Sequence, residues 1–196
     1  MDKVEVVRRQ LGTALHLFLI DADPVSVHTL ASAACEIAEH LTRLAGRQPF
    51  SSHALPTFVD MKIEELRNLQ RKYYNAFKHM TDRSGAARDD SQVLEEFQDE
   101  HNDAVLFIGW YDYLAACEHE PLEAQVFQAW FFAMHPEKLV PDVDPAPYMW
   151  VFPKLKDANR NEQKAQLREV IERYRGDPEL MNDPRTDRRP LMMIKR

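Results

Sequence analysis

The chain has 196 residues, of which 44% are hydrophobic, so it can bury one good core but is too short for two full domains. The chain has five glycines and 12 prolines. It therefore has little of the pattern typical of many short strands, which is β-branched residues separated by glycine-containing turns, and this favours helices over an all-β fold. The net charge of −7 is uneven, because residues 89–137 contain 12 Asp and Glu and no Lys or Arg. A surface built from that stretch repels phosphate, whereas the basic residues between positions 43 and 88 could attract it.

The first two helices are predicted from apolar residues that recur every three or four positions, over residues 4–18 and 27–44. Asp23 is placed to cap the second helix, and Pro24 stands at its first position, where a missing N–H is harmless. Gly46 can end that helix in a left-handed conformation. Because the connection between them is so short, the two helices should be antiparallel neighbours.

The same periodicity predicts three more helices, over residues 57–80, 90–117 and 121–133, after a proline-containing loop at residues 47–56. These elements together predict an all-α fold, an up-and-down bundle of about five core helices that covers residues 1–135.

The remainder, residues 136–196, is predicted to be a Pro-rich extension with one charged helix over residues 159–174. An apolar patch at residues 148–152 is expected to lie as a flap on the bundle, or else to contact a second subunit or another protein. The C-terminal arm, from residue 185 onward, is expected to pack on the bundle or on a partner subunit.

Several classes of protein lack their usual signature in this chain. No apolar run reaches the roughly 18 residues that a membrane-spanning helix needs, and the charged first residues do not resemble a signal peptide, so we expect a cytoplasmic protein without membrane contact. Cys35 and Cys117 are expected to be reduced core thiols. Gly-rich phosphate loops, Gly-x-Ser-x-Gly elbows and His-Glu-x-x-His motifs do not occur, and we expect no cofactor.

The candidate catalytic residues lie where the third helix should end, and they are Asn75, Lys78, His79 and, one turn earlier, Arg71. Metal-free cleavage of RNA needs a base near the 2′-hydroxyl, which His79 could supply, and a cation that stabilises the transition-state charge. Lys78 points about 100° away from His79 around a helix, whereas Arg71 shares a face with it at about 12 Å along the axis. Alternatively, Asn75, Lys78 and His79 only complement the carbonyls and dipole of the helix C-terminus.

The order of the helices, the Asp-Pro-Val-Ser-Val-His-Thr-Leu-Ala-Ser-Ala-Ala segment at residues 23–34 and the Asn-Ala-Phe-Lys-His segment at residues 75–79 resemble the HEPN superfamily. That superfamily comprises small helical bundles of prokaryotic toxin, defence and RNA-processing systems. The resemblance implies a homodimer in which two copies of an Arg…His motif face each other and cut RNA without a metal. The histidine maps to His79 and the adjacent polar residue to Asn75, but Tyr74 stands where the arginine belongs.

We therefore expect a HEPN-like helical module without catalytic activity, which acts through protein contacts in a bacterial stress, defence or toxin–antitoxin setting. The alternative is a metal-independent endoribonuclease in which His79 and Asn75 are assisted by Arg71 or Lys78 across a homodimer. RNA binding through the aromatic and basic residues of the third helix is not favoured, because aromatic residues at helical spacing are more often core.

A second alternative is a ligand- or metal-binding helical bundle. Glu36 and His40 lie one turn apart, and acids crowd residues 96–103 together with His101. Helical di-iron sites pair Glu with a His three residues later, and that spacing does not occur here, so we expect no metal.

Overall fold

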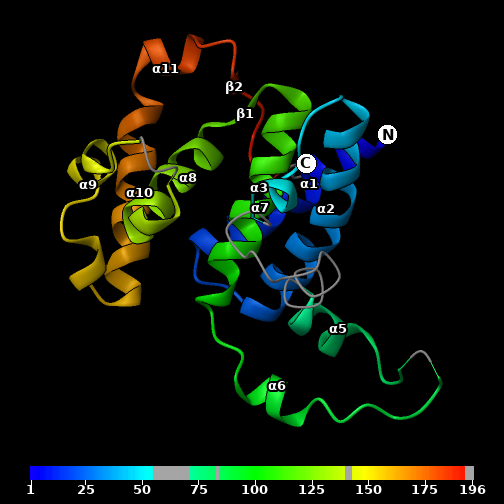
Figure 1. The fold of residues 1–196 in the computed structure, drawn as a ribbon. Coiled ribbons are helices and arrows are strands. Elements are labelled where there is room, and N and C mark those ends of the chain that lie inside the picture. Colours follow the sequence, from blue (N-terminus) through cyan, green and yellow to red (C-terminus); the bar gives the residue numbers. More distant parts are fainter. Residues whose placement is uncertain (55–70, 83, 140–142, 193–196) are drawn as a thin grey trace. The chain divides into compact units, whose positions relative to one another are not determined.

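The computed structural model describes residues 1–54, 71–82, 84–139 and 143–192. Helices make up most of these residues, and the one sheet among them has two strands of two residues each (Figure 1), so the predicted all-α class is confirmed. The chain forms two compact units, residues 1–116 and 117–196. Within the described ranges, no helix is long and apolar enough to cross a membrane.

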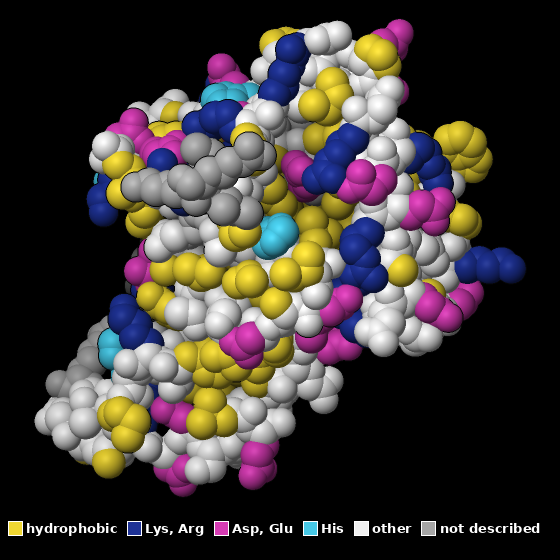
Figure 2. Space-filling model, turned by 180° about the vertical axis from the view of Figure 1, so that it is seen from behind, with side chains coloured by type: hydrophobic (Ala, Val, Ile, Leu, Met, Phe, Trp, Pro, Cys, Tyr) yellow, Lys and Arg dark blue, Asp and Glu magenta, His cyan; other side chains and the backbone are white. Residues whose placement is uncertain are grey.

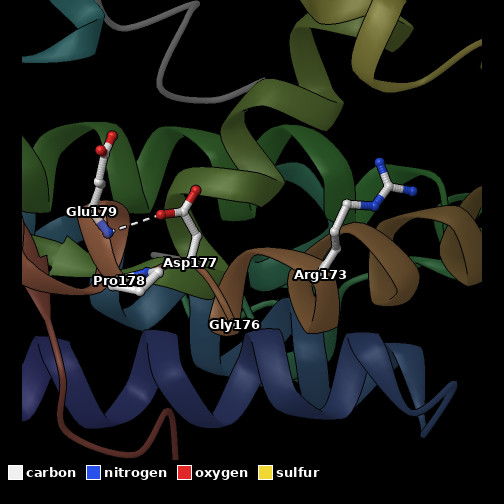
Figure 3. Close-up of a pocket in the computed structure, with 5 residues that line it drawn as sticks. All are labelled: Arg173, Gly176, Asp177, Pro178 and Glu179. Atoms are coloured by element: carbon white, nitrogen blue, oxygen red, sulfur yellow. Dashed lines mark hydrogen bonds between the residues drawn. The ribbon is translucent and has the colours of Figure 1, made fainter.

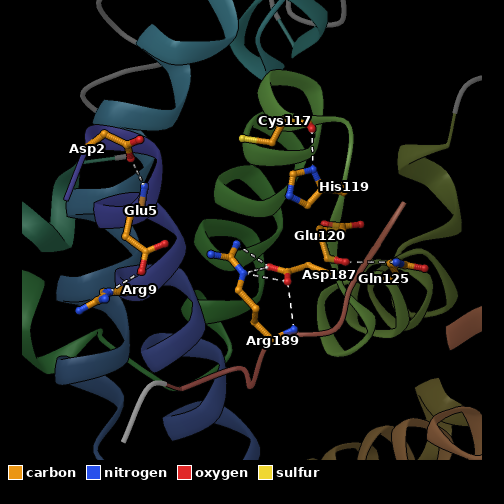
Figure 4. Close-up of polar contacts among 9 residues, drawn as sticks. All are labelled: Asp2, Glu5, Arg9, Cys117, His119, Glu120, Gln125, Asp187 and Arg189. Atoms are coloured by element: carbon orange, nitrogen blue, oxygen red, sulfur yellow. Dashed lines mark hydrogen bonds and ion pairs between the residues drawn. The ribbon is translucent and has the colours of Figure 1, made fainter. Parts of the chain in front are cut away.

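The first unit contains α1 (Lys3–Leu19), α2 (Pro24–Leu44), α3 (Phe50–Ala54), α5 (Lys72–Lys78), α6 (Ser91–Glu95) and α7 (His101–Cys117), of which α7 runs to the boundary of the unit. α1 and α2 are the predicted neighbouring pair. Each is capped by an aspartate, because Asp2 accepts a hydrogen bond from the Glu5 N–H (2.8 Å, Figure 4) and Asp23 accepts one from the Ser26 N–H (2.8 Å). Gly46 follows α2 with φ +73°, the expected left-handed stop.

The core of this unit depends on the close approach of α7 to α1 and α2. A Cβ atom at Gly109 would lie 2.6 Å from Leu11 Cδ2 and 3.2 Å from Cys35 Sγ, so only glycine fits between these side chains. Two side chains of α2 also bond to carbonyls of α7: the Cys35 thiol donates to Val105 O (3.3 Å) and the Thr42 hydroxyl donates to Asp112 O (2.7 Å). The three helices are therefore joined by both packing and hydrogen bonds.

Two predicted helices differ from the observed elements. Most of the helix expected over residues 57–80 lies outside the described residues, and its described end, α5, stops at Lys78 rather than at residue 80. The helix expected over residues 90–117 is broken into α6 and α7. At the break, His101 Nδ1 accepts a hydrogen bond from the Gln98 N–H (3.0 Å), and the Phe97 ring packs against His28 of α2.

The second unit contains β1 (Glu120–Pro121), α8 (Leu122–Met134), the 3₁₀ turn η2 (Pro136–Lys138), α9 (Ala146–Val151), the 3₁₀ turn η3 (Leu155–Asp157), α10 (Arg160–Arg175), α11 (Pro178–Asn182) and β2 (Thr186–Asp187). α8 packs on α10, where the Trp130 Nε1–H donates to Gln163 O (3.1 Å). α10 is the predicted charged helix, and Asn159 and Glu162 form a capping box at its start. The boundary expected at residue 135 would separate α8 from the helix it packs against.

The start of the C-terminal arm, residues 185–187, lies against β1 of its own unit. β2 pairs in parallel with β1, and the Glu120 N–H donates to Arg185 O (2.9 Å). The Gln125 carboxamide bridges the two strands, because its Nε2 donates to Glu120 O (3.3 Å, Figure 4) and to the Thr186 hydroxyl (3.0 Å). The Glu120 side chain is buried beneath this pair, bonded to Gln128, and burial raises its pKa well above the ordinary value.

Gly109→Val should lower the free energy of unfolding by about 2–3 kcal/mol, because the added atoms overlap Leu11 and Cys35 in a filled core. Gly176→Val is the matched control, since Gly176 is exposed and a Cβ there would meet only Arg173 O at 3.5 Å, and it should change that energy by less than about 0.5 kcal/mol. Urea unfolding followed by circular dichroism measures both. Equal effects of the two substitutions would contradict the packing described for α7.

Candidate functional site

The predicted catalytic residues lie on and around α5. The Asn75 N–H donates to Arg71 O (2.8 Å) and the His79 N–H donates to Asn75 O (3.0 Å), so these residues follow one another along the same short helix. His79 has an extended backbone (φ −120°, ψ 123°), because it is the residue at which the helix stops. Its side chain therefore leaves the end of the helix instead of continuing the face on which Asn75 lies.

Tyr74, at the position where the resemblance places an arginine, is a core residue. Its side chain is only 8% exposed, and the ammonium group of Lys78 lies over its ring, 5.0 Å from the centroid. A guanidinium group at this position would be buried and would need a charged partner. Where the resemblance implies a cation, the chain thus has a packed aromatic ring.

The remaining candidate residues do not converge. The Arg71 guanidinium pairs with Glu36 of α2, with 3.2 Å between Nε and Oε1, which engages the nearest arginine with α2. The His79 imidazole is exposed, and within the described ranges neither it nor the Asn75 carboxamide forms a hydrogen bond. A base and a cation therefore do not meet at this place within one chain.

Beneath α5 lies a cluster of rings that the sequence analysis did not anticipate, which we call the aromatic cluster. It consists of His28, Tyr73, Phe77, Phe97 and His101 and joins α2, α5 and the α6–α7 connection. His28 is at its centre, with edge-on ring centroids at 5.7 Å (Tyr73), 5.8 Å (Phe77) and 5.3 Å (Phe97). The aromatic residues of α5 that could have stacked on RNA bases are thus used to hold α5 in place.

The tautomer of His28 follows from its neighbour Asn102. The Asn102 Nδ2 donates to Pro24 O (3.1 Å), which makes its Oδ1 the acceptor for the His28 Nδ1–H (3.0 Å). The other nitrogen, Nε2, carries the lone pair and has no hydrogen-bond partner among the described residues. Burial lowers the pKa of His28 to about 4, the bond to Asn102 acts in the opposite direction, and the charge of His101 lowers the pKa further.

A second polar contact joins α5 to the start of α7. The Tyr73 hydroxyl lies 2.9 Å from His101 Nε2, and the Lys72 ammonium pairs with Glu96 at 2.7 Å. Because the His101 Nδ1 also accepts a hydrogen bond from the Gln98 N–H, the imidazole links α5 to the segment before α7. These contacts are structural, since each polar atom has a partner within the fold.

The metal-binding alternative finds no support in the geometry. Glu36 pairs with Arg71, while His40 is exposed, and Glu96 pairs with Lys72. In the part of the chain that the structure describes, no group of three or more His, Cys, Asp or Glu side chains could hold a metal ion.

Four of the described basic residues expected to attract phosphate are paired with carboxylates. Besides Arg71 and Lys72, Arg43 pairs with Glu39 (2.5 Å) and Arg88 with Asp90 (2.7 Å). On the face drawn in Figure 2, basic and acidic side chains lie interspersed. Such a mixed surface neutralises its own field and does not provide the uniform positive track that binds a nucleic-acid backbone.

Asp112 is a buried acid that the sequence analysis did not single out. It lies in α7, and its Oδ1 accepts a hydrogen bond from the Phe50 N–H at the start of α3 (2.7 Å). Burial raises its pKa to about 7; the bond from Phe50 and the charge of Arg43 act in the opposite direction, and the charge of Glu39 adds to the increase. Glu39 itself accepts hydrogen bonds from Ser51 (2.8 Å) and Arg43. Asp112 and Glu39 thus hold the start of α3 in place through their bonds to Phe50 and Ser51.

A hollow in the second unit lies at the turn between α10 and α11 and is lined by Arg173, Gly176, Asp177, Pro178 and Glu179 (Figure 3). The Asp177 carboxylate is already used, because it accepts a hydrogen bond from the Glu179 N–H (2.8 Å), and Arg173 pairs with Glu169 (3.0 Å). The hollow therefore offers no group of converging side chains for catalysis.

Comparison with protein-family models, with curated proteins and with solved structures finds no match for this chain.

His28 should make the first unit less stable in acid. Its pKa is about 4 in the folded chain against 6.5 ordinarily, so the stability it contributes is complete above pH 6.5 and is lost as the pH falls from 6.5 to 4, on the order of 3 kcal/mol. His28→Gln cannot titrate but can still donate to Asn102, and it should reduce this loss. Urea unfolding between pH 7 and 4 measures the difference. His40→Gln, at an exposed histidine, should keep the wild-type slope, and an unchanged slope in His28→Gln would refute the assignment.

Asp112 should have the opposite effect. Its pKa of about 7 exceeds the ordinary 3.8, so the stability that it contributes is complete below pH 3.8 and is lost as the pH rises to 7. Asp112→Asn keeps the acceptor for the Phe50 N–H and cannot ionise, so at pH 8 it should be more stable than the wild type by a few kcal/mol, roughly, and nearly equal at pH 4. The same unfolding series, with the exposed Asp157→Asn as control, checks this. A variant that is less stable at pH 8 contradicts it.

Proposed function

We propose that this chain is a HEPN-like helical module without ribonuclease activity, which acts through protein contacts in a bacterial stress, defence or toxin–antitoxin setting. The observation that carries the proposal is the burial of Tyr74 at the position of the missing arginine. The arginine has been replaced by a ring that belongs to the core, and the nearest arginine is engaged with Glu36.

The chemical argument concerns the transition state. Cleavage of a phosphodiester without a metal needs a fixed cation near the phosphoryl oxygens, where negative charge develops, and loss of one such donor typically lowers the rate by about 10²- to 10³-fold. Lys78 is the remaining cation beside His79, and it lies over the Tyr74 ring. His79 could act as the base, but its neighbouring cation, Lys78, is held over the Tyr74 ring and does not serve the transition state.

The surface around α5 favours a protein partner. Met80, next to His79, is 87% exposed, and Leu94 of α6 is exposed as well. Large apolar side chains that stay in water commonly mark contact surfaces. Lys78 and His79 directly precede Met80 in the sequence and would give such a contact a polar rim.

The test of activity is incubation of micromolar protein with labelled single-stranded RNA in EDTA, for the wild type, His79→Ala and His40→Ala. We expect no cleavage above buffer in any of the three. His40 is the matched control, because it is an exposed helical histidine on α2.

Cleavage that is present in the wild type and in His40→Ala but lost in His79→Ala would overturn the proposal. In that event, mixing His79→Ala chains with Arg71→Ala chains would identify the origin of the cation. Activity restored by mixing would mean that the histidine and the arginine come from different chains, as the alternative of a metal-independent endoribonuclease requires.

A further inference from the structure

Helix α9 divides the apolar patch of residues 148–152 into a buried side and an exposed side. Tyr148 packs on Phe132 of α8, with ring centroids 5.4 Å apart, and Phe152 is completely buried. Met149 and Trp150 point away from these contacts, since they are 50% and 84% exposed. The patch is thus only in part the flap that was expected, and its largest ring lies in solvent.

The exposed side is held in a fixed position. The Phe152 N–H donates to Tyr148 O (3.0 Å), and the buried Leu155 follows directly in η3. Gln163 of α10 secures η3, because its Nε2 donates to Leu155 O (3.3 Å) and to Ala158 O (2.9 Å). Trp150 is therefore presented by a segment anchored on both α8 and α10, and tryptophan is among the residue types that contribute most to binding at interfaces.

The sequence around Met149 has a charge pattern that reverses about its centre. Residues 144–154 read Asp-Pro-Ala-Pro-Tyr-Met-Trp-Val-Phe-Pro-Lys, so an acid and a base stand five positions before and after Met149, and a proline stands four positions away on each side. One oxygen of Asp144 accepts a hydrogen bond from the Ala146 N–H (2.9 Å). Lys154 is exposed and has no ion pair among the described residues.

We propose that the exposed side of α9 is a self-association surface, on which a second copy of this chain binds antiparallel about a two-fold axis near Met149. In such a contact, any residue that lies a given number of positions before Met149 meets the residue that lies the same number of positions after it in the other copy. Asp144 of each chain therefore faces Lys154 of its partner. α9 is about 9 Å long. At this length the Trp150 side chains can fill the centre of the interface while Asp144 and Lys154 pair at each end of it. This inference does not rest on the proposed function, since the surface is the same in a chain with or without ribonuclease activity.

The first experiment is sedimentation equilibrium of the full chain over a series of concentrations. We expect the mass to rise from 22.9 kDa towards twice that value, and Trp150→Ala to weaken the association by at least about tenfold. Leu44→Ala, at an exposed apolar side chain of α2, is the matched control and should leave it unchanged. Thermal unfolding of each variant confirms that it is folded.

The second experiment tests the antiparallel pairing. Asp144→Lys and Lys154→Asp should each weaken the association by about tenfold, because each places like charges opposite each other. The double variant exchanges the two charges and should restore the wild-type affinity within about threefold.

A chain that stays at 22.9 kDa up to concentrations on the order of 100 μM overturns the inference, and so does a dimer that is unaffected by Trp150→Ala. A double charge variant that stays as weak as the single ones overturns the antiparallel arrangement. Binding to lipid vesicles or to another protein by a chain that stays monomeric would assign the surface to that partner instead. None of these results depends on the RNA assay, so the two proposals fail separately.

Discussion

The close contact at Gly109 is the constraint on which the first unit depends. Because this residue has no side chain, α7 comes near enough to α1 and α2 for Leu11 and Cys35 to fill the space above it. At that separation the Cys35 thiol and the Thr42 hydroxyl reach carbonyl groups of α7. A wider spacing would leave a cavity lined by Leu11 and would break both hydrogen bonds.

The position of α7 in turn determines the two buried ionisable groups of this unit. At one end of the helix Asn102 reaches His28, and nearer its other end Asp112 reaches the start of α3. Burial lowers the pKa of the base His28 and raises that of the acid Asp112, so in both cases it favours the neutral form over the charged one. Their contributions to stability change in opposite directions with pH and partly cancel between pH 4 and 6.5.

The first two helices could be predicted from residues close together in the sequence, whereas the break between α6 and α7 depends on contacts between residues far apart in it. Asp23 and Pro24 start α2 and Gly46 ends it, and each does so through neighbouring residues, so the signals can be recognised in the sequence. The break between α6 and α7 depends on Phe97, whose ring packs on His28 from a helix much earlier in the chain. Periodicity cannot report such a contact, because it describes one helix at a time.

The same distinction applies to the candidate site. That Tyr74 stands where the HEPN resemblance implies an arginine was visible in the sequence, but the burial of that ring and the pairing of Arg71 with Glu36 are tertiary facts. For Asp112 a signal did exist, since a lone carboxylate between Tyr111 and Tyr113, in an apolar helix, must be buried or must interrupt the core. His28 likewise lay next to Val27 on the seam of α2.

The strand pair of the second unit imposes an order on how the chain acquires its structure during synthesis. Every element of the first unit precedes residue 117 or ends there, so this unit can fold while the rest of the chain is still being made. The second unit has all its helices before it has β2, and until Thr186 and Asp187 exist, Glu120 has no strand beside it. An ionised carboxylate is inexpensive on a nascent chain in water, and it becomes costly when the side chain is buried in the folded unit. Folding of the second unit thus favours the neutral form of Glu120, because burial raises its pKa.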